Sequence, residues 1–412
     1  MRRTLKPLSA LLVALLALEL AFHLRPGLLP RSYRERFPMH GIELFHPGIL
    51  ERTPIEGIPL PIVVGSYSGP PPADLKEMGV APPDEDADAR AFPHVSIPVD
   101  ALGFPNPRDM ERADLVLVGD SFAVAAGALE PEGLQARLAR ETGLSVFNLG
   151  VSAVGPVQEE WLLGEVGFEK HPRAVVWFLY SGNDVSGSLT PYAYKRKGQD
   201  TWAEAYADRR VPRFILPDLV KTLLRPKAAA KESSPLPGFV FRRADGKEQP
   251  IWFEPGELLQ LSWTREAWEK NLAWRTTRNI LQRVQKSCAE RGIRFLLVYL
   301  PAKAEVHLPF VTADAALAHR TASSILPEPL AQDSETFLGA ALEHRRDLER
   351  IVEEFCASQG MPFLSATPPL EELAKRGELG FLVTDTHWQS IGQGALLTPL
   401  VELLRAEGIV GP

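Results

Sequence analysis

The chain has 412 residues, of which 45% are hydrophobic and 24% are charged, and its formal net charge is −7. This composition is that of an ordinary globular protein, and the length suits one enlarged α/β domain or two smaller ones. The negative net charge argues against nucleic acid as a main partner, because binding to phosphates needs a basic face. Lysine and arginine do gather between Arg209 and Lys231, which favours a solvated surface segment over a patch for an anionic polymer.

The two cysteines, Cys288 and Cys356, are too few for a disulfide framework, and no CxxC pair or Cys/His cluster is present to bind a metal through sulfur. Both lie at apolar positions of predicted helices, so two buried thiols are expected. One disulfide between them stays open if the chain lies outside the cytoplasm. No metal or other cofactor is expected.

Residues 1–25 predict a membrane anchor. Three basic residues within the first six precede an apolar run, Leu8–Leu24, that contains Glu19 and His23. About 20 apolar residues span a bilayer, so the run is just long enough. The positive flank keeps the amino end cytoplasmic, and no small-x-small cleavage site follows. We therefore expect an uncleaved single-pass anchor in the lipid of the inner membrane, with the rest of the chain extracytoplasmic (periplasmic).

Two further regions follow the anchor. Residues 26–105 are rich in proline, including the run Pro70–Pro72, and contain an acidic DEDAD stretch, which predicts an extended tether with short strands. Residues 106–412 predict one catalytic domain with an insertion at about 185–263. Long loops inside a compact fold are usually functional or disordered.

From residue 106 onward, apolar stretches with strand character alternate with amphipathic stretches. Strands are predicted at 115–118, 145–149, 174–180, 294–300 and 362–365, and helices at 131–143, 156–166, 265–290, 342–357 and 391–407. Such alternation with short connections predicts an α/β fold. The expected architecture is a three-layer α/β/α sandwich with a central parallel five-stranded sheet (flavodoxin-like), preceded by one N-terminal transmembrane helix.

Three of these strands end in glycine and polar residues. They are followed by Gly119-Asp120-Ser121, by Asn148-Leu149-Gly150, and by Ser181-Gly182-Asn183-Asp184. Strands of a parallel sheet share a direction, so these ends meet at one edge, where open α/β sheets place ligands and chemistry. A fourth polar segment, Thr384–Trp388 (TDTHW), precedes the last helix.

Together the four segments supply the groups needed for acyl transfer through a covalent serine intermediate. Ser121 is the expected nucleophile, and His387 is the expected base because the ordinary pKa of an imidazole lies near neutrality. Asp385, two residues before the histidine, is expected to fix the tautomer of the imidazole. Taken singly, His387 is more commonly a surface histidine, so the prediction depends on all four segments together.

The oxyanion that forms during acyl transfer needs hydrogen-bond donors. We expect them among the backbone N–H of Ser121, a backbone N–H near Ala153–Gly155 and the side-chain amide of Asn183, with Gly150 in the same substrate-binding set. Asn183 could equally be a turn former after its strand.

Two further residues have structural expectations. Trp388 is expected to pack beneath the histidine loop. Lys303, in the turn after the fourth strand, is expected to be exposed.

The four segments, GDSF, the glycine block, GND and DTHW, resemble the SGNH (GDSL-type) hydrolase superfamily in their order and in their positions after strands. The membrane anchor and the DxHW ending are similar to an anchored branch that includes alginate O-acetyltransferase-like proteins of exopolysaccharide systems. The resemblance covers 113–153, 174–184 and about 381–407. It implies the roles given above for Ser121, His387, Asp385 and Asn183. The usual oxyanion glycine falls on Ala153 or, with a shifted alignment, on Gly155.

The expected function is an extracytoplasmic serine esterase or O-acyltransferase that acts on acetyl (short acyl) esters of a polysaccharide through an acyl-Ser121 intermediate. The expected partners are a carbohydrate or other acyl-ester substrate and a membrane acyl-donor partner. Two alternatives stay open. One is a glycan-binding or assembly subunit of an exopolysaccharide system that lost turnover, and the other is a lipase or thioesterase.

Overall fold

The computed structural model describes residues 14–21, 66–69, 95–98, 100, 102, 104–124, 133–151, 154–188, 216–217, 238–312, 314–326, 329–383 and 386–411. The chain divides into two compact units, 1–64 with 191–232, and 65–190 with 233–412. All of the predicted site residues belong to the second unit.

In the first unit the structure describes a helix over residues 14–21, and the carboxylate of Glu19 accepts a hydrogen bond from the backbone N–H of Leu216 at 2.8 Å. Among the described residues, no helix combines the length and the apolar character needed to cross a bilayer. The remainder of the predicted anchor run lies outside the described residues. So does the basic stretch 209–231, apart from 216–217.

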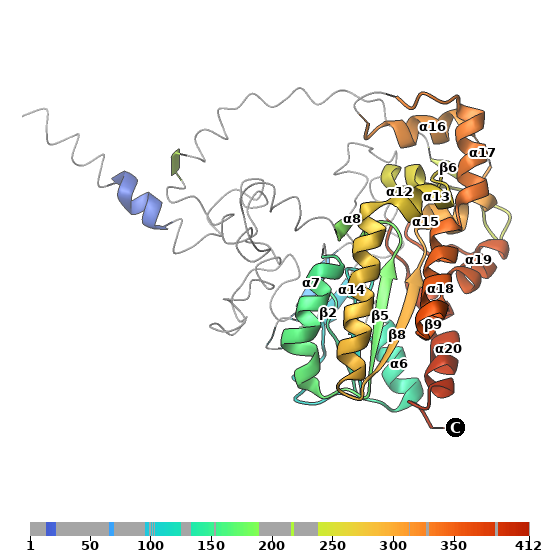
Figure 1. Cartoon of the computed structure of the whole chain (residues 1–412). Helices are drawn as coiled ribbons and strands as arrows, with labels where there is room; N and C mark the ends of the chain where they lie inside the picture. The colour runs from blue at the N-terminus through green and yellow to red at the C-terminus, as the bar shows by residue number, and fades with distance from the viewer. Residues whose placement is uncertain are drawn as a thin grey trace, which may run out of the picture. The chain divides into compact units, whose positions relative to one another are not determined.

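A parallel five-stranded sheet forms the centre of the second unit, which confirms the predicted α/β fold (Figure 1). In spatial order its strands are β4 (Val146–Asn148), β3 (Leu115–Val118), β5 (Ala174–Tyr180), β8 (Arg294–Leu300) and β9 (Phe363–Ser365). The second strand along the chain lies outside the first, and the others follow in sequence, which is the flavodoxin-like order. Every neighbouring pair is parallel, so the carboxyl ends of all five strands share one edge.

Helices cover both faces of this sheet (Figure 1). One face is covered by α6 (Leu134–Thr142) and α20 (Ser390–Ala406), and the other by α7 (Pro156–Leu162), α14 (Leu272–Ala289) and α18 (Asp347–Gln359). Trp274 of α14 meets Phe355 of α18 edge to face at 5.8 Å, which places these two helices on the same side. The predicted three-layer arrangement is therefore present.

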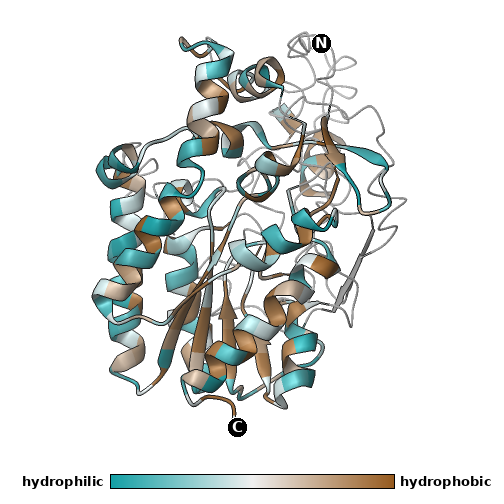
Figure 2. Cartoon of the chain, turned by 90° about the vertical axis from the view of Figure 1, so that its right-hand side faces the viewer, coloured by the Kyte–Doolittle hydropathy of each residue, from teal (hydrophilic) through white to brown (hydrophobic). Residues whose placement is uncertain are grey.

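The sheet is apolar on both faces, as the continuous apolar runs predicted (Figure 2). Val176 and Phe178 of β5 pack into one core with Leu396 and Leu400 of α20. The intervening Trp177 points to the opposite face, because successive side chains of a strand alternate. Burying one such side chain stabilises the fold by roughly 1.5–3 kcal/mol.

Two predicted helices have different bounds in the structure. The helix expected over 265–290 is broken at Asn271, which is extended (φ −66°, ψ 128°) and separates α13 (Arg265–Lys270) from α14. The Asn271 side chain accepts the N–H of Ala273 at 2.7 Å and so begins α14 as its N-cap. The helix expected over 342–357 is α18, which begins only at Asp347 because α17 (Ser334–His344) precedes it.

The structure adds elements that the sequence did not predict. They are the strand pair β6 (Phe239–Arg242) with β7 (Glu248–Ile251), and the helices α8 (Asp184–Gly187), α12 (Pro255–Gln260), α15 (Lys303–His307), α16 (Ala315–Ser323) and α19 (Thr367–Lys375). The antiparallel strands β1 (Ser66–Gly69) and β2 (Val95–Pro98) lie within the predicted tether, where short strands were expected. The last part of the predicted insertion belongs to the core, since Phe239, Phe241 and Ile251 are buried there.

Phe104 and Asn106, where the predicted tether meets the predicted domain, complete the edge of the sheet. Phe104 is fully buried and meets Phe147 of β4 edge to face at 5.8 Å. The Asn106 side chain donates to the carbonyl of Asn148 at 3.0 Å and accepts its N–H at 2.7 Å, so it replaces a neighbouring strand beside β4. Asp100 accepts the Asn106 amide at 2.9 Å and holds it in place.

Candidate active site

The turn after β3 presents Ser121 at the carboxyl edge of the sheet. Gly119 begins this turn with φ +156°, and a Cβ there would lie 3.1 Å from the Cβ of Ala123 and 3.2 Å from the Cβ of Phe178. A side chain at position 119 would therefore press against both the turn and β5. Glycine lets the chain leave the strand sharply and place the serine at the edge.

Asp120 organises the residues that follow. Its carboxylate accepts the N–H of Phe122 at 2.9 Å, and its carbonyl accepts the N–H groups of Ala123 and Val124 at 3.1 and 3.2 Å. The N–H of Ser121 takes no part in these bonds, and its side chain is half-buried. The turn thus holds the hydroxyl rigidly and leaves this N–H as a candidate donor to an oxyanion.

His387 reaches Ser121 from the loop before α20. Its Nε2 lies 2.7 Å from the Ser121 Oγ, although 266 residues separate the two in sequence. The loop is closed by the N–H of Leu382, which donates to the carbonyl of His387 at 2.8 Å, and by a β-bridge between Phe381 and Trp388. The histidine is only 6% exposed, so its ring is held in the protein rather than free in solvent.

Aromatic packing fixes the plane of the imidazole. The ring of Phe122 stacks on that of His387 with centroids 5.1 Å apart and on that of Tyr180 at 3.9 Å. Trp388 is 1% exposed and lies 5.9 Å from Phe122, which confirms the expectation that it packs beneath the loop. Ser121 is therefore followed directly by the side chain that supports its predicted base.

Two of the predicted site residues, Asp385 and Ala153, lie outside the described residues. Their roles, as the acid that orients His387 and as an oxyanion donor, remain predictions.

The structure places the other predicted donors at the same edge of the sheet. Asn183 is exposed at the start of α8, and its side chain is one of the groups that lower the pKa of Asp120, so it lies beside the serine turn. The N–H of Gly150 donates to Asn148 Oδ1 at 2.8 Å, and the N–H of Gly155 donates to Gln158 Oε1 at 3.3 Å. Both glycine N–H groups are therefore engaged within the protein.

Gly150 has a packing role against the serine turn. A Cβ at this position would lie 2.7 Å from the Cβ of Ala123 and 2.8 Å from the N of Val124. Asn148 reinforces the contact, because its amide donates to the carbonyl of Ala123 at 2.6 Å. The ends of β3 and β4 are thereby locked together.

Three buried carboxyl groups lie beneath the serine. Burial raises the pKa of Asp120 to about 6, although the N–H of Phe122 and the positive charge of His387 partly offset this. Burial, together with the negative charge of Asp120, raises the pKa of Glu159 well above its usual range. Burial and the negative charges of Glu159 and Asp120 also raise the pKa of Asp184 well above its usual range. Oδ2 of Asp184 accepts the N–H of Tyr180 at 2.7 Å. Glu159 and Asp184 therefore favour their neutral forms, which limits the negative charge near the site.

The expectation for Lys303 is wrong. This lysine is fully buried, and its Nζ donates to the carbonyl of Val383 at 2.8 Å, within the loop that holds His387. A turn after a strand is usually exposed, but here Lys303, at the start of α15, contacts the loop that holds His387. No local pattern in the sequence indicates this contact.

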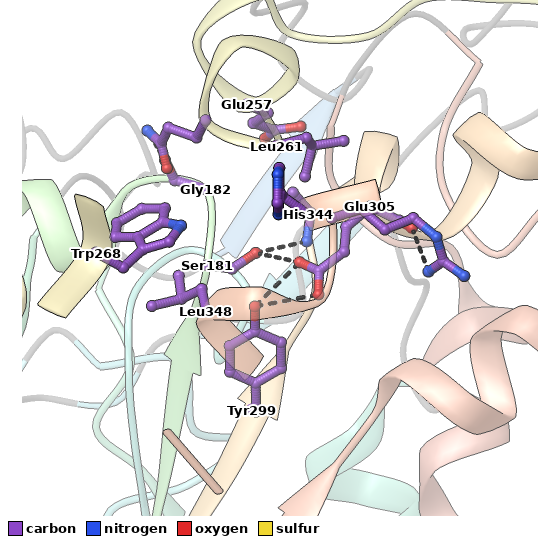
Figure 3. A pocket seen from close by; sticks show the side chains of 12 residues that line it. Ser181, Gly182, Glu257, Leu261, Trp268, Tyr299, Glu305, His344 and Leu348 are labelled. Atoms are coloured by element: carbon purple, nitrogen blue, oxygen red, sulfur yellow. Dashed lines mark hydrogen bonds between the residues drawn. The ribbon is translucent and has the colours of Figure 1, made fainter. Parts of the chain in front are cut away.

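A small hollow lies between the ends of β5 and β8 (Figure 3). Its lining includes Ser181, Tyr299 and Glu305, which are joined by hydrogen bonds, together with Glu257 and Trp268. Burial raises the pKa of Glu305 to about 8. Glu257 belongs to the last part of the insertion and was not predicted as a site residue.

No family model matches the chain, and no curated protein matches it. Among solved structures it is similar to a GDSL-like lipase from Bacteroides thetaiotaomicron, with 10% identity, 72% of this chain and 89% of that chain covered, and a TM-score of 0.34. It is also similar to a phospholipase A1 from Streptomyces albidoflavus (12% identity, 71% and 99% covered, TM-score 0.35). A carbohydrate acetylesterase family member from Sinorhizobium meliloti gives 12% identity, 71% and 97% coverage and a TM-score of 0.34. TM-scores of this size carry no inference about activity, so the function proposed below rests on the geometry of the site.

Proposed function

We propose that this chain is a serine acyl hydrolase of the SGNH type that cleaves short-chain esters through an acyl-Ser121 intermediate. The observation that carries the proposal is the 2.7 Å contact between Ser121 Oγ and His387 Nε2. This is the distance at which an imidazole accepts the proton of a serine hydroxyl. A chance pairing of two surface residues would not combine this distance with a buried, stacked histidine.

The reaction follows from this pair. Ser121 Oγ attacks the ester carbonyl carbon while its proton passes to His387 Nε2, and the carbonyl electron pair moves onto oxygen. When that oxyanion collapses, the C–O bond to the alcohol breaks and the alcohol leaves with the proton from Nε2. Water then attacks the acyl-serine by the same route. It releases the carboxylic acid and returns the proton to Ser121.

The oxyanion is stabilised by the N–H of Ser121 and by the side-chain amide of Asn183. Both belong to the carboxyl edge of the sheet, and the exposure of Asn183 leaves its amide accessible to a substrate. Loss of one such donor typically costs about 3 kcal/mol of transition-state stabilisation. Asp385 orients His387 in this proposal.

The substrate class is proposed from the sequence. The basic and apolar amino-terminal run supports a membrane-anchored, extracytoplasmic protein, and the similarity of the DTHW segment to the anchored branch supports acetyl esters of a polysaccharide. Transfer to a sugar hydroxyl uses the same acyl-Ser121 intermediate, with the hydroxyl in place of water. A membrane partner would then supply the acyl group.

The test combines turnover with covalent labelling. The wild-type protein should hydrolyse p-nitrophenyl acetate and take up one fluorophosphonate probe. Ser121→Ala and His387→Ala should lower kcat/KM by about 10³-fold or more, and Ser121→Ala should abolish labelling. Ser358→Ala and His171→Asn, which change a serine and a histidine outside the site, serve as matched controls and should behave like wild type.

Three other results would redirect the proposal. Equal labelling of wild type and Ser121→Ala would discard Ser121 as the nucleophile. Retention on an immobilised polysaccharide without release of acetate would favour a glycan-binding subunit. Turnover that rises with acyl length would favour a lipase or thioesterase.

A further inference from the structure

Glu257 joins Tyr180 and Thr386 through hydrogen bonds beside the catalytic histidine. The Thr386 hydroxyl donates to Glu257 Oε1 at 2.5 Å and lies 2.8 Å from the Tyr180 hydroxyl. Tyr180 also donates to the same oxygen of Glu257. The three residues are 3%, 2% and 9% exposed, so these bonds form away from solvent. A carboxylate oxygen accepts both hydroxyl groups here.

The three residues come from distant parts of the chain. Tyr180 ends β5, Glu257 lies in the first turn of α12, and Thr386 precedes His387 in its loop. The carboxylate and the threonine are 129 residues apart. The part of the insertion that carries Glu257 is therefore attached directly to the catalytic loop.

A second contact ties the same two segments together. The N–H of Trp252 donates to the carbonyl of Val383 at 3.1 Å. The segment 252–257 thus meets the loop at two points, before and after the stretch 384–385. Lys303 holds Val383 from another side through its Nζ.

The hydrogen-bonded set reaches the imidazole by two routes. Thr386 fixes the backbone next to His387, whose carbonyl is itself bound to the N–H of Leu382. The ring of Tyr180 supports Phe122, and Phe122 stacks on the imidazole. Movement of the tyrosine or the threonine would shift Nε2 relative to Ser121 Oγ.

We propose that Glu257 is a positioning residue for His387, acting through the hydroxyl of Thr386 and the ring of Tyr180. The inference rests on the proposed ester chemistry, in which Nε2 must keep its reach to Ser121 Oγ while the proton passes. A misplacement of about 1 Å at a reacting group costs on the order of 10²-fold in rate. Glu257 itself exchanges no proton with the substrate.

The chain offers a matched control in Glu305. This residue is also a buried glutamate at the same edge of the sheet, and it accepts hydrogen bonds from Tyr299 and Ser181, each at 3.0 Å (Figure 3). Tyr299 belongs to β8 in the same way that Tyr180 belongs to β5. No hydrogen bond that the described residues form joins the Glu305 side chain to the histidine loop. Its substitution removes a comparable buried network.

The experiment compares Glu257→Ala and Thr386→Val with Glu305→Ala in the full chain. Glu257→Ala and Thr386→Val should each lower kcat by about 10- to 100-fold and leave KM within about threefold. Thr386→Ser, which keeps the hydroxyl, should restore kcat to within about threefold of wild type. Because Glu257 and Thr386 act as one unit, the kcat of the double variant should be little lower than that of either single variant. Glu305→Ala should keep the wild-type kcat even where its melting temperature falls.

A turnover-independent measurement separates this inference from the proposed function. The NMR signals of the His387 ring, assigned by their loss in His387→Ala, should shift in Glu257→Ala and Thr386→Val and stay unchanged in Glu305→Ala. Unchanged signals and unchanged kcat in the first two variants would overturn the positioning role. A wild-type protein without esterase activity or Ser121 labelling would overturn the proposed function instead, and the ring signals would still decide the role of Glu257.

Discussion

At the residue scale, the serine turn contains a buried carboxyl group, that of Asp120. Asp120 is 1% exposed, and burial raises its pKa from 3.8 to about 6. Between these two pH values the folded protein keeps a proton that the unfolded chain has lost. The stability contributed by this proton is present below pH 3.8 and is lost as the pH rises through about 6.

Replacement of Asp120 by asparagine should therefore stabilise the protein at neutral pH relative to acid pH. The amide can still accept the N–H of Phe122 and carries no charge to bury. A pKa difference of this size corresponds to about 3 kcal/mol, so unfolding by urea should show Asp120→Asn gaining up to that amount over wild type between pH 4 and pH 7.5.

Asp114 supplies a control of opposite sign. A hydrogen bond from Ser145 lowers the pKa of Asp114, so its stabilising contribution is present above the unfolded pKa and lost at acid pH. Asp114→Asn should therefore lose stability relative to wild type as the pH rises. A parallel response of the two variants would contradict the charge-burial account.

The site residues differ in how far the sequence could predict them. Ser121 and His387 were predictable, because each follows a strand or precedes a helix in a short polar motif. Lys303 and Glu257 were not, since their roles arise from contacts with a loop that is distant in sequence. Periodicity reports which face of an element is buried, and it contains no information about which distant loop covers that face.

At the scale of elements, all five central strands were predictable because each is a short, largely apolar run that alternates with predicted helices. The break between α13 and α14 was not, because the helical pattern continues across it and only the capping bond of Asn271 reveals it. The hairpin of β6 and β7 was not predictable for another reason. Its strands are only four residues each, too short for alternation to stand out.

Asn106 should contribute more to stability than its place in a polar connection suggests. The Asn106 side chain now bonds to the N–H and the carbonyl of Asn148 and to the side-chain amide of Gln135. Asn106→Ala would remove this buried partner from all three groups. Loss of such bonds costs about 1–3 kcal/mol for each group left unsatisfied, so we expect destabilisation of about 3 kcal/mol in chemical unfolding. The exposed Arg108, changed to alanine, should stay within about 0.5 kcal/mol of wild type.

At the scale of the molecule, the candidate active site and its supports belong to one unit. Ser121, Asn183, Glu257 and His387 all fall within 65–190 and 233–412, whereas residues 1–64 belong to the other unit. Every contact given above for Ser121 and His387 lies within this unit, which does not include the amino-terminal run. That run remains a predicted anchor.

Removal of residues 1–25 should separate membrane binding from catalysis. The shortened protein should keep kcat/KM on p-nitrophenyl acetate within about twofold of the full chain, because the described supports of Ser121 and His387 stay in place. Only the full chain should float with phospholipid vesicles in a density gradient. Flotation of both forms would contradict the predicted anchor, and loss of activity without loss of folding would contradict the independence of the site.

The two buried thiols bear on the redox environments in which the folded protein can exist. Cys288 and Cys356 are both free and fully covered, and burial raises the pKa of each thiol to about 12. Almost no thiolate exists at neutral pH, so neither sulfur is a ready target for oxidants or for exchange with other thiols. Once folded, the protein can therefore keep both thiols in a reducing or an oxidising environment.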